Sequence, residues 1–141
     1  MDTEYLEAIE NIIRTGHWIT DQVNQELKDM GISEPQYNVL KILKVKKGQP
    51  VTVQEIQEMM VQRTSNVTRI MDKLIEKGLA CRDICPANRR KMDNSLTSAG
   101  SKLLNQLDKK VYRFHQPMAE NLTDEEAKTL TKLIKKLKGD K

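Results

Sequence analysis

The apolar residues of the first thirty positions recur every three or four residues, which is the period of one face of an α-helix. This stripe consists of Tyr5, Ile9, Ile12, Ile13, Ile19, Val23 and Leu27. Gly31 follows it, where a helix commonly stops. Trp18 points away from the stripe, so it is expected either to be exposed or to touch a second surface. The spacing predicts one long helix over about 3–30.

Three hydroxyl residues stand three positions before Gln or Glu, which is the capping-box spacing at the start of a helix. The pairs are Ser33 with Gln36, Thr52 with Glu55, and Thr123 with Glu126. An apolar stripe follows each pair, which predicts three further helices. Another stripe runs from Val67 to a stop at Gly78, and another begins after Thr97. Pro117 is expected to kink or end that last helix.

The stretch LACRDICPANRRKMDNSLT, residues 79–97, is too short and too rich in turn residues for another such helix. It predicts two short strands flanking a turn at residues 86–91. The expected fold class is therefore mostly α with a small β-ribbon. A chain of 141 residues fits a single domain, 1–141, with enough core to fold alone.

The positive charge of the chain is concentrated in one segment. The net charge is +4. Residues 61–91 hold eight cations and three anions, a balance of +5, whereas the remaining residues hold sixteen cations and seventeen anions. Such clustering is typical of a surface that binds a polyanion, although a solvated face with a chance bias would look similar.

Several classes of protein fit the sequence poorly. No apolar run approaches the roughly 18 residues needed to span a membrane, and the acidic N-terminus does not resemble a signal peptide, so we expect a cytoplasmic protein without membrane partners. No Gly-rich phosphate loop, metal cluster or paired nucleophile and base stands out. We therefore expect no enzyme activity, no catalytic residues, no metal and no cofactor.

Three short helices followed by a β-ribbon describe a winged helix-turn-helix, in which the second helix of the motif enters the major groove of DNA. The outer face of the helix near residues 66–77 carries short polar and cationic side chains that can pair with bases or phosphates. The predicted DNA-binding residues there are Arg63, Thr64, Ser65, Asn66, Thr68, Arg69 and Lys73. On the wing they are Asn88, Arg89, Arg90 and Lys91, which would meet phosphates or the minor groove.

The stretch SNVTRIMDKLIEKGLACRDICPANRRKMDNSLTSAG resembles the recognition helix, wing and following helix of the MarR family of bacterial transcription factors. The shared signatures are TR-x-x-D-x-L-x-x-x-GL, R-R and LT-x-x-G. The resemblance implies a winged helix-turn-helix lobe over about 34–96 and dimerisation helices over about 3–30 and 97–138. It also implies a homodimer that binds double-stranded DNA at a pseudo-palindromic operator, most often as a repressor released by a small hydrophobic or phenolic effector.

Two features depart from the family pattern. The family wing commonly has Asp before its Arg pair, where this chain has Asn88. The returning strand, MDNS, is unusually polar, which predicts a short or mobile wing.

Three hypotheses stay open at the level of sequence. His17, Trp18 and Tyr37 could line the family's small-molecule pocket, or they could pack between the first two helices. Cys81 and Cys85 could sense oxidants or be inert thiols; on a strand they lie roughly 13 Å apart, too far for a direct disulfide. The protein could also be an architectural or adaptor protein that binds DNA or partners without reading sequence.

Overall fold

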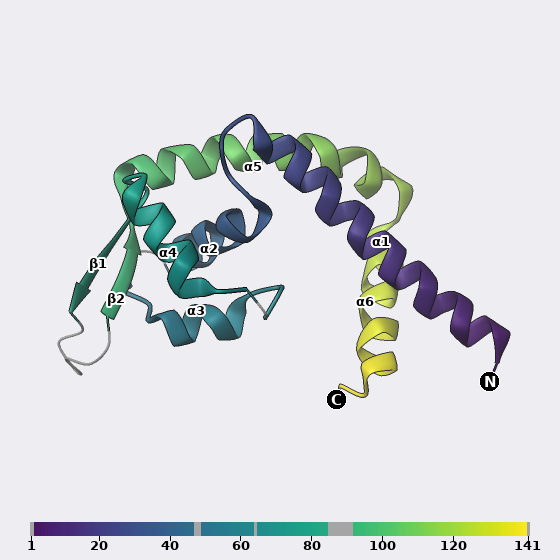
Figure 1. Ribbon diagram of the computed structural model, residues 1–141. Coiled ribbons are helices and arrows are strands. Elements are labelled where there is room, and N and C mark those ends of the chain that lie inside the picture. Colours follow the sequence, from purple (N-terminus) through teal and green to yellow (C-terminus); the bar gives the residue numbers. More distant parts are fainter. Residues whose placement is uncertain (1, 47–48, 64, 85–91, 141) are drawn as a thin grey trace.

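The chain folds into six helices and one two-stranded antiparallel sheet within the part that the computed structural model describes, residues 2–46, 49–63, 65–84 and 92–140. The elements are α1 (Thr3–Lys28), α2 (Glu34–Val45), α3 (Val53–Met59), α4 (Val67–Glu76), β1 (Ala80–Ile84), β2 (Met92–Leu96), α5 (Ser98–Asn121) and α6 (Asp124–Lys138). Figure 1 shows α2, α3, α4 and the sheet gathered into one lobe, with α5 running across it. The prediction of a mostly helical chain with a small β-ribbon is confirmed. The predicted wing turn lies outside the described residues.

The helix starts follow from local capping. All three predicted capping boxes form, with the hydroxyl accepting from the backbone N–H three residues on and the Gln or Glu side chain accepting from the capping residue's own N–H. Asp2 caps α1 in a similar way. Each cap satisfies backbone donors that a helix start otherwise leaves unpaired.

The core lies where α2 and α4 meet α5 and the C-terminal half of α1. Leu27, Leu40, Leu74, Leu104 and Leu107 are fully buried and come from these four helices. Only the last third of α1 contributes buried residues, although its apolar stripe runs along the whole helix. The core therefore fixes α4 against a rigid support of α2 and α5.

The returning strand β2 is ordered by a buried polar side chain. Asn94 pairs with Arg82 in the ladder and is 0% exposed. Its backbone exchanges two hydrogen bonds with Val51, and its Nδ2 donates to the Val51 carbonyl at 2.9 Å. A polar residue of the returning strand, Asn94, thus joins β2 to the segment before α3.

The junction between β2 and α5 leaves no room for a side chain at Gly100. A Cβ built on Gly100 would stand 2.0 Å from the Leu79 carbonyl oxygen. Thr97 holds the two segments together, because its N–H donates to Leu79 O at 3.1 Å and its hydroxyl to Gly78 O at 2.7 Å. The hydroxyl also accepts from Gly100 N at 3.0 Å, which caps α5. This junction is the structural reason for the LT-x-x-G signature.

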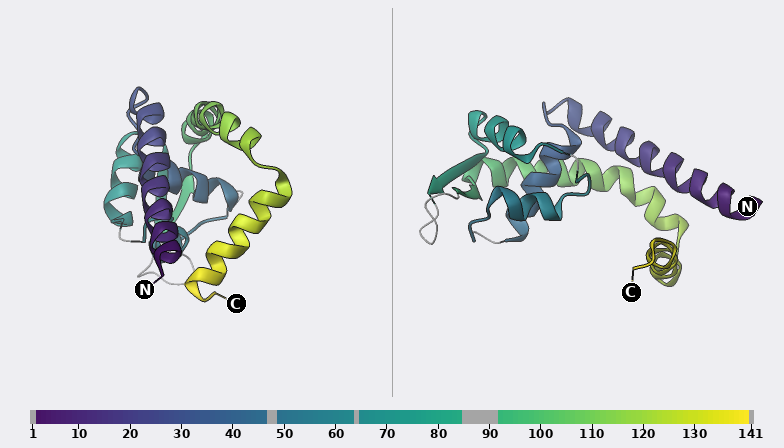
Figure 2. Two further views of the ribbon diagram at one scale, coloured as in Figure 1. Left: turned by 90° about the vertical axis from the view of Figure 1, so that its right-hand side faces the viewer. Right: turned by 60° about the horizontal axis from the view of Figure 1, so that its bottom comes forward.

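Two helices extend beyond the lobe (Figure 2). The sequence predicted either a kink or an end of the helix at Pro117. The helix does not end there, because α5 continues through Pro117 to Asn121. α6 buries none of its residues, although Leu130, Leu133 and Leu137 lie on one face. Among the described residues, no helix is both long enough and apolar enough to span a bilayer.

Candidate nucleic-acid interface

α4 turns one apolar face into the core and leaves a polar face outside. Val67, Met71 and Leu74 are buried, whereas Thr68, Arg69 and Lys73 are exposed. The buried face packs against α2 and β1, so the outward direction of the polar side chains is fixed by the lobe and not by α4 alone. The predicted recognition face is therefore accessible on a rigid helix.

Asn66 has a role that the sequence did not reveal. It is the N-cap of α4, and its Oδ1 accepts from Arg69 N at 3.1 Å. Its oxygen is therefore engaged within the protein, and its Nδ2 is left as a donor for a ligand. An adenine-reading Asn needs both atoms, so Asn66 is better suited to position α4 and donate one bond than to read adenine bidentately.

Asp72 does not add a free negative charge to this face, because it forms an ion pair with Arg82 of β1. The pair links α4 to β1. Arg69 and Lys73 are the cations of α4, and both are exposed; Glu76, in the last turn of the same face, is an exposed anion. An exposed cationic face on a helix is the arrangement that phosphate and base contacts require.

The other predicted DNA-binding residues are placed only in part. The side chain of Arg63 is exposed, and its backbone carbonyl accepts from Gln57 Nε2 at 2.6 Å. Ser65 is half-buried beside the start of α4. The predicted residues outside the described part of the chain are Thr64, Asn88, Arg89, Arg90 and Lys91.

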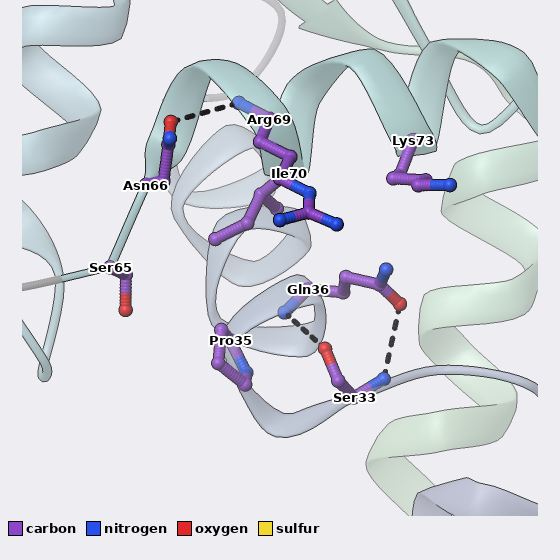
Figure 3. A pocket seen from close by; sticks show the side chains of 8 residues that line it. All are labelled: Ser33, Pro35, Gln36, Ser65, Asn66, Arg69, Ile70 and Lys73. Carbon is purple, nitrogen blue, oxygen red and sulfur yellow. Dashed lines mark hydrogen bonds between the residues drawn. The ribbon is translucent and has the colours of Figure 1, made fainter.

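A groove separates the first turn of α2 from α4 (Figure 3). Its volume is about 370 Å³. It is lined by Ser33, Pro35, Gln36, Ser65, Asn66, Arg69, Ile70 and Lys73. The structure therefore brings four of the predicted DNA-binding residues together with side chains that the sequence identified only as a helix cap. No sequence signal shows this juxtaposition, because it depends on how α2 packs against α4.

Two of the three residues predicted for an effector pocket, Trp18 and Tyr37, contact α5 at separate points. Trp18 makes an edge-to-face contact with Phe114, with ring centroids 5.6 Å apart. Tyr37 is buried, and its hydroxyl donates to Asp108 Oδ1 at 2.6 Å. Burial and the neighbouring Asp108 raise the pKa of the Tyr37 phenol above its ordinary value. His17 is exposed on α1.

Cys81 is exposed on β1, and its Sγ lies 3.0 Å from Ser95 Oγ on the neighbouring strand. Cys85 lies outside the described residues. The redox hypothesis for these two thiols stays a prediction.

Comparison with known proteins shows which family and which solved structures this chain resembles. The sequence profile described as the MarR family matches residues 32–92, from just before the α2 cap into β2. The chain is 28% identical over 119 residues to the HTH-type transcriptional regulator MhqR of Bacillus subtilis, covering 84% of this chain and 81% of that protein. A crystal structure of mutant MarR from Escherichia coli complexed with operator DNA is 26% identical, with a TM-score of 0.80 and coverage of 97% and 99%. AbsC of Streptomyces coelicolor, at 18% identity, shares the fold with a TM-score of 0.86 over 99% and 95% of the two chains.

A helical lobe with an exposed helix beside a two-stranded ribbon defines the class of winged helix-turn-helix proteins. Within that class, the chain is similar to MarR-family transcriptional regulators, through the family match over residues 32–92 and through the relatives and solved structures above. The relative MhqR is described as a transcriptional regulator, and the MarR structure is bound to operator DNA.

Proposed function

We propose that the protein is a homodimeric repressor that acts in the cytoplasm and binds a pseudo-palindromic operator in double-stranded DNA. The observation that carries this proposal is the outer face of α4, where Arg69 and Lys73 are exposed while Asp72 is neutralised by Arg82. A rigid helix of this kind fits the major groove, which is about 12 Å wide.

The wing supplies the second contact in this proposal. The ion pair between Asp72 of α4 and Arg82 of β1 holds the first strand of the hairpin against α4. The recognition helix therefore orients the hairpin. Three cations follow β1 in the sequence, namely Arg89, Arg90 and Lys91. We expect them to contact phosphates or the minor groove beside the site of α4.

Exposed apolar surface supports the homodimer. Leu130, Leu133 and Leu137 of α6 and Leu6 and Ile13 of α1 are each more than 40% exposed in the single chain. α6 buries no residue of its own, yet its apolar side chains lie on one face. An isolated helix of fifteen residues is marginal in water. A second copy of the chain would cover both surfaces and place two lobes about one DNA turn apart.

The effector site is proposed for the junction of α1, α2 and α5. Trp18 of α1 offers an exposed ring beside Phe114 of α5, and the Tyr37 phenol of α2 is hydrogen-bonded to Asp108 of the same α5. A small hydrophobic or phenolic molecule that wedges between these helices would change the angle of the lobe against the dimer helices. The two lobes would then no longer match the spacing of two half-sites.

Selection of bound sequences from random double-stranded DNA tests the proposed function. We expect enrichment of a pseudo-palindrome whose half-sites are separated by about one helical turn, roughly 34–36 Å. Protection footprinting on the selected sequence should show one discrete protected region. Uniform protection and no enriched sequence would instead identify an architectural or adaptor protein.

A further inference from the structure

The groove between α2 and α4 is suited to an anion. The eight described residues that line it are all neutral or cationic, and two of them, Arg69 and Lys73, carry positive charge. Four lining residues have polar but uncharged side chains and come from the start of α4 or the capping box of α2, namely Ser65, Asn66, Ser33 and Gln36. Pro35 and Ile70 supply apolar wall between the polar groups.

Gln36 presents a fixed donor to this groove. Its Oε1 accepts from Ser33 N at 3.1 Å, and this capping bond determines which end of the amide faces outward. The Nε2 group is therefore turned away from the cap, and Figure 3 shows it pointing toward Lys73. The backbone N–H groups of Ser33 and Gln36 are both used within the capping box, so the side chains carry the recognition.

The position of the groove beside α4 relates it to DNA geometry. A helix with its side chains is about 10–12 Å across and nearly fills a major groove about 12 Å wide. The phosphate rows on the two rims of the major groove must then pass along the elements that flank the helix. α4 packs against β1 and also against α2, and Figure 1 shows these two elements on different sides of it.

We propose that the groove between α2 and α4 receives the sugar-phosphate backbone of one DNA strand, with Gln36 as a phosphate contact beside Lys73. The inference rests on the proposed function and adds to it a second backbone contact, on the side of α4 away from the wing. α2 thereby fixes how deeply the recognition helix enters the major groove. The apolar wall of Pro35 and Ile70 faces the deoxyribose.

A small organic anion could also match two cations and an apolar wall. DNA is the better match because Ser65, Asn66 and Arg69 belong both to the groove and to the recognition face, so that the two surfaces are continuous. The groove between α2 and α4 is open to solvent and does not enclose an occupant. An extended chain of regularly spaced phosphates fits such a surface better than a single small molecule does.

The substitution Gln36→Glu tests this proposal without removing the cap, because Glu is itself a capping-box residue. It keeps an acceptor for Ser33 N and replaces the outward amide donor with a carboxylate oxygen. The matched control is Gln106→Glu, which adds the same charge at an exposed position of α5 outside the groove. Both variants should show the thermal unfolding midpoint of the parent.

We expect Gln36→Glu to weaken binding about tenfold on the selected operator and by a similar factor on random-sequence duplex of the same length, because a phosphate contact carries no sequence information. Gln106→Glu should bind both DNAs like the parent.

Equal affinities for the two variants on the operator would overturn the proposal and leave operator recognition itself intact. Millimolar benzoate offers a second test. If benzoate released DNA from the parent but not from Gln36→Glu, the proposal would be overturned and the groove would be assigned to a small anion. Failure of the parent to select any operator would count against the proposed function instead.

Discussion

Single residues determine both the stability of the lobe and its proposed contacts, and Gly100 is the clearest case. Its Cα passes so close to the Leu79 carbonyl that a methyl group would collide with backbone, which cannot move aside as a flexible side chain can. Gly16 is the opposite case, because a Cβ there would meet no atom within 4 Å in this chain. The two glycines therefore predict opposite effects of the same substitution.

Gly100→Ala should lower the free energy of unfolding by about 1–3 kcal/mol or more, the range for overpacking a tight site. Gly16→Ala should raise it by about 0.5–1 kcal/mol, because alanine favours the helix. Urea unfolding of both variants at one protein concentration measures the difference. An unchanged midpoint for Gly100→Ala would show that the junction of Leu79 and α5 is looser than described.

Arg69→Ala should weaken operator binding and reduce discrimination at one base position of each half-site by about 1–3 kcal/mol, the range for a base-reading arginine. The measurement is affinity for a set of operators with single base changes. Arg113→Ala removes the same charge from an exposed position of α5 and serves as the control. Equal losses on operator and random DNA would show that Arg69 contacts phosphate alone.

The sequence predicted which residues of α4 face outward, because the period of a helix determines this. It did not predict what Asn66 and Asn94 do. Both are short polar residues in positions that a sequence reader assigns to a surface, yet one caps α4 and the other is buried against Val51. The role of Asn94 depends on Val51, which is distant in sequence, and the role of Asn66 depends on where α4 begins. A local sequence pattern shows neither.

At the scale of elements, α2 connects the DNA lobe to α5. Tyr37 of α2 donates to Asp108 of α5 at 2.6 Å, and Lys44 Nζ lies 3.6 Å from the same carboxylate and 3.2 Å from Asn105 Oδ1. One buried phenol and one partly exposed cation thus hold the two helices in register. Any change in the angle between lobe and α5 has to alter this cluster.

The raised pKa of Tyr37 makes a pH dependence predictable. An unfolded tyrosine loses its proton near pH 10, whereas the folded chain keeps the Tyr37 proton to higher pH. The stabilisation is therefore complete below about pH 10 and is lost as pH rises toward the folded pKa. Urea unfolding between pH 7 and pH 11 should show this fall in the parent.

Tyr37→Phe should lower stability at neutral pH by about 1–2 kcal/mol, because it removes a hydrogen bond to a carboxylate. It should also flatten the fall above pH 10. Tyr112→Phe, at a position 64% exposed on α5, should change neither quantity. Parallel pH curves for the parent and Tyr37→Phe would contradict the assignment.

The elements themselves were largely predictable. Capping boxes and apolar periods are local, so the starts of α2, α3 and α6 were predicted to the residue. The continuation of α5 through Pro117 was not determined by the sequence. Proline removes one helical hydrogen bond, and whether the helix ends there depends on what the following turn can pack against.

At the scale of the whole molecule, the surfaces of α1 and α6 are incomplete without a partner. The sequence showed that these helices carry more apolar residues than one lobe can cover, and the structure leaves those residues exposed. The partner's placement could not be predicted, because an apolar stripe identifies a buried face but not the residues that cover it.

Replacing two leucines of α6, Leu130→Gln together with Leu133→Gln, should shift the protein from dimer to monomer at micromolar concentration. Burying each leucine contributes about 1.5–3 kcal/mol, and a twofold interface loses each contact twice. The control Lys128→Gln with Lys132→Gln changes exposed residues on the opposite face of the same helix. Sedimentation equilibrium distinguishes the outcomes, and an unchanged dimer would place the interface elsewhere.

The uncovered α6 also has a consequence for the lifetime of the protein. A chain separated from its partner would carry a helix, α6, that buries no residue. Such a segment unfolds readily and becomes a site of proteolytic cleavage, whereas the same segment is protected in a dimer. Newly made chains that find no second copy would then be removed first, so degradation would set a lower limit on the concentration at which the regulator accumulates.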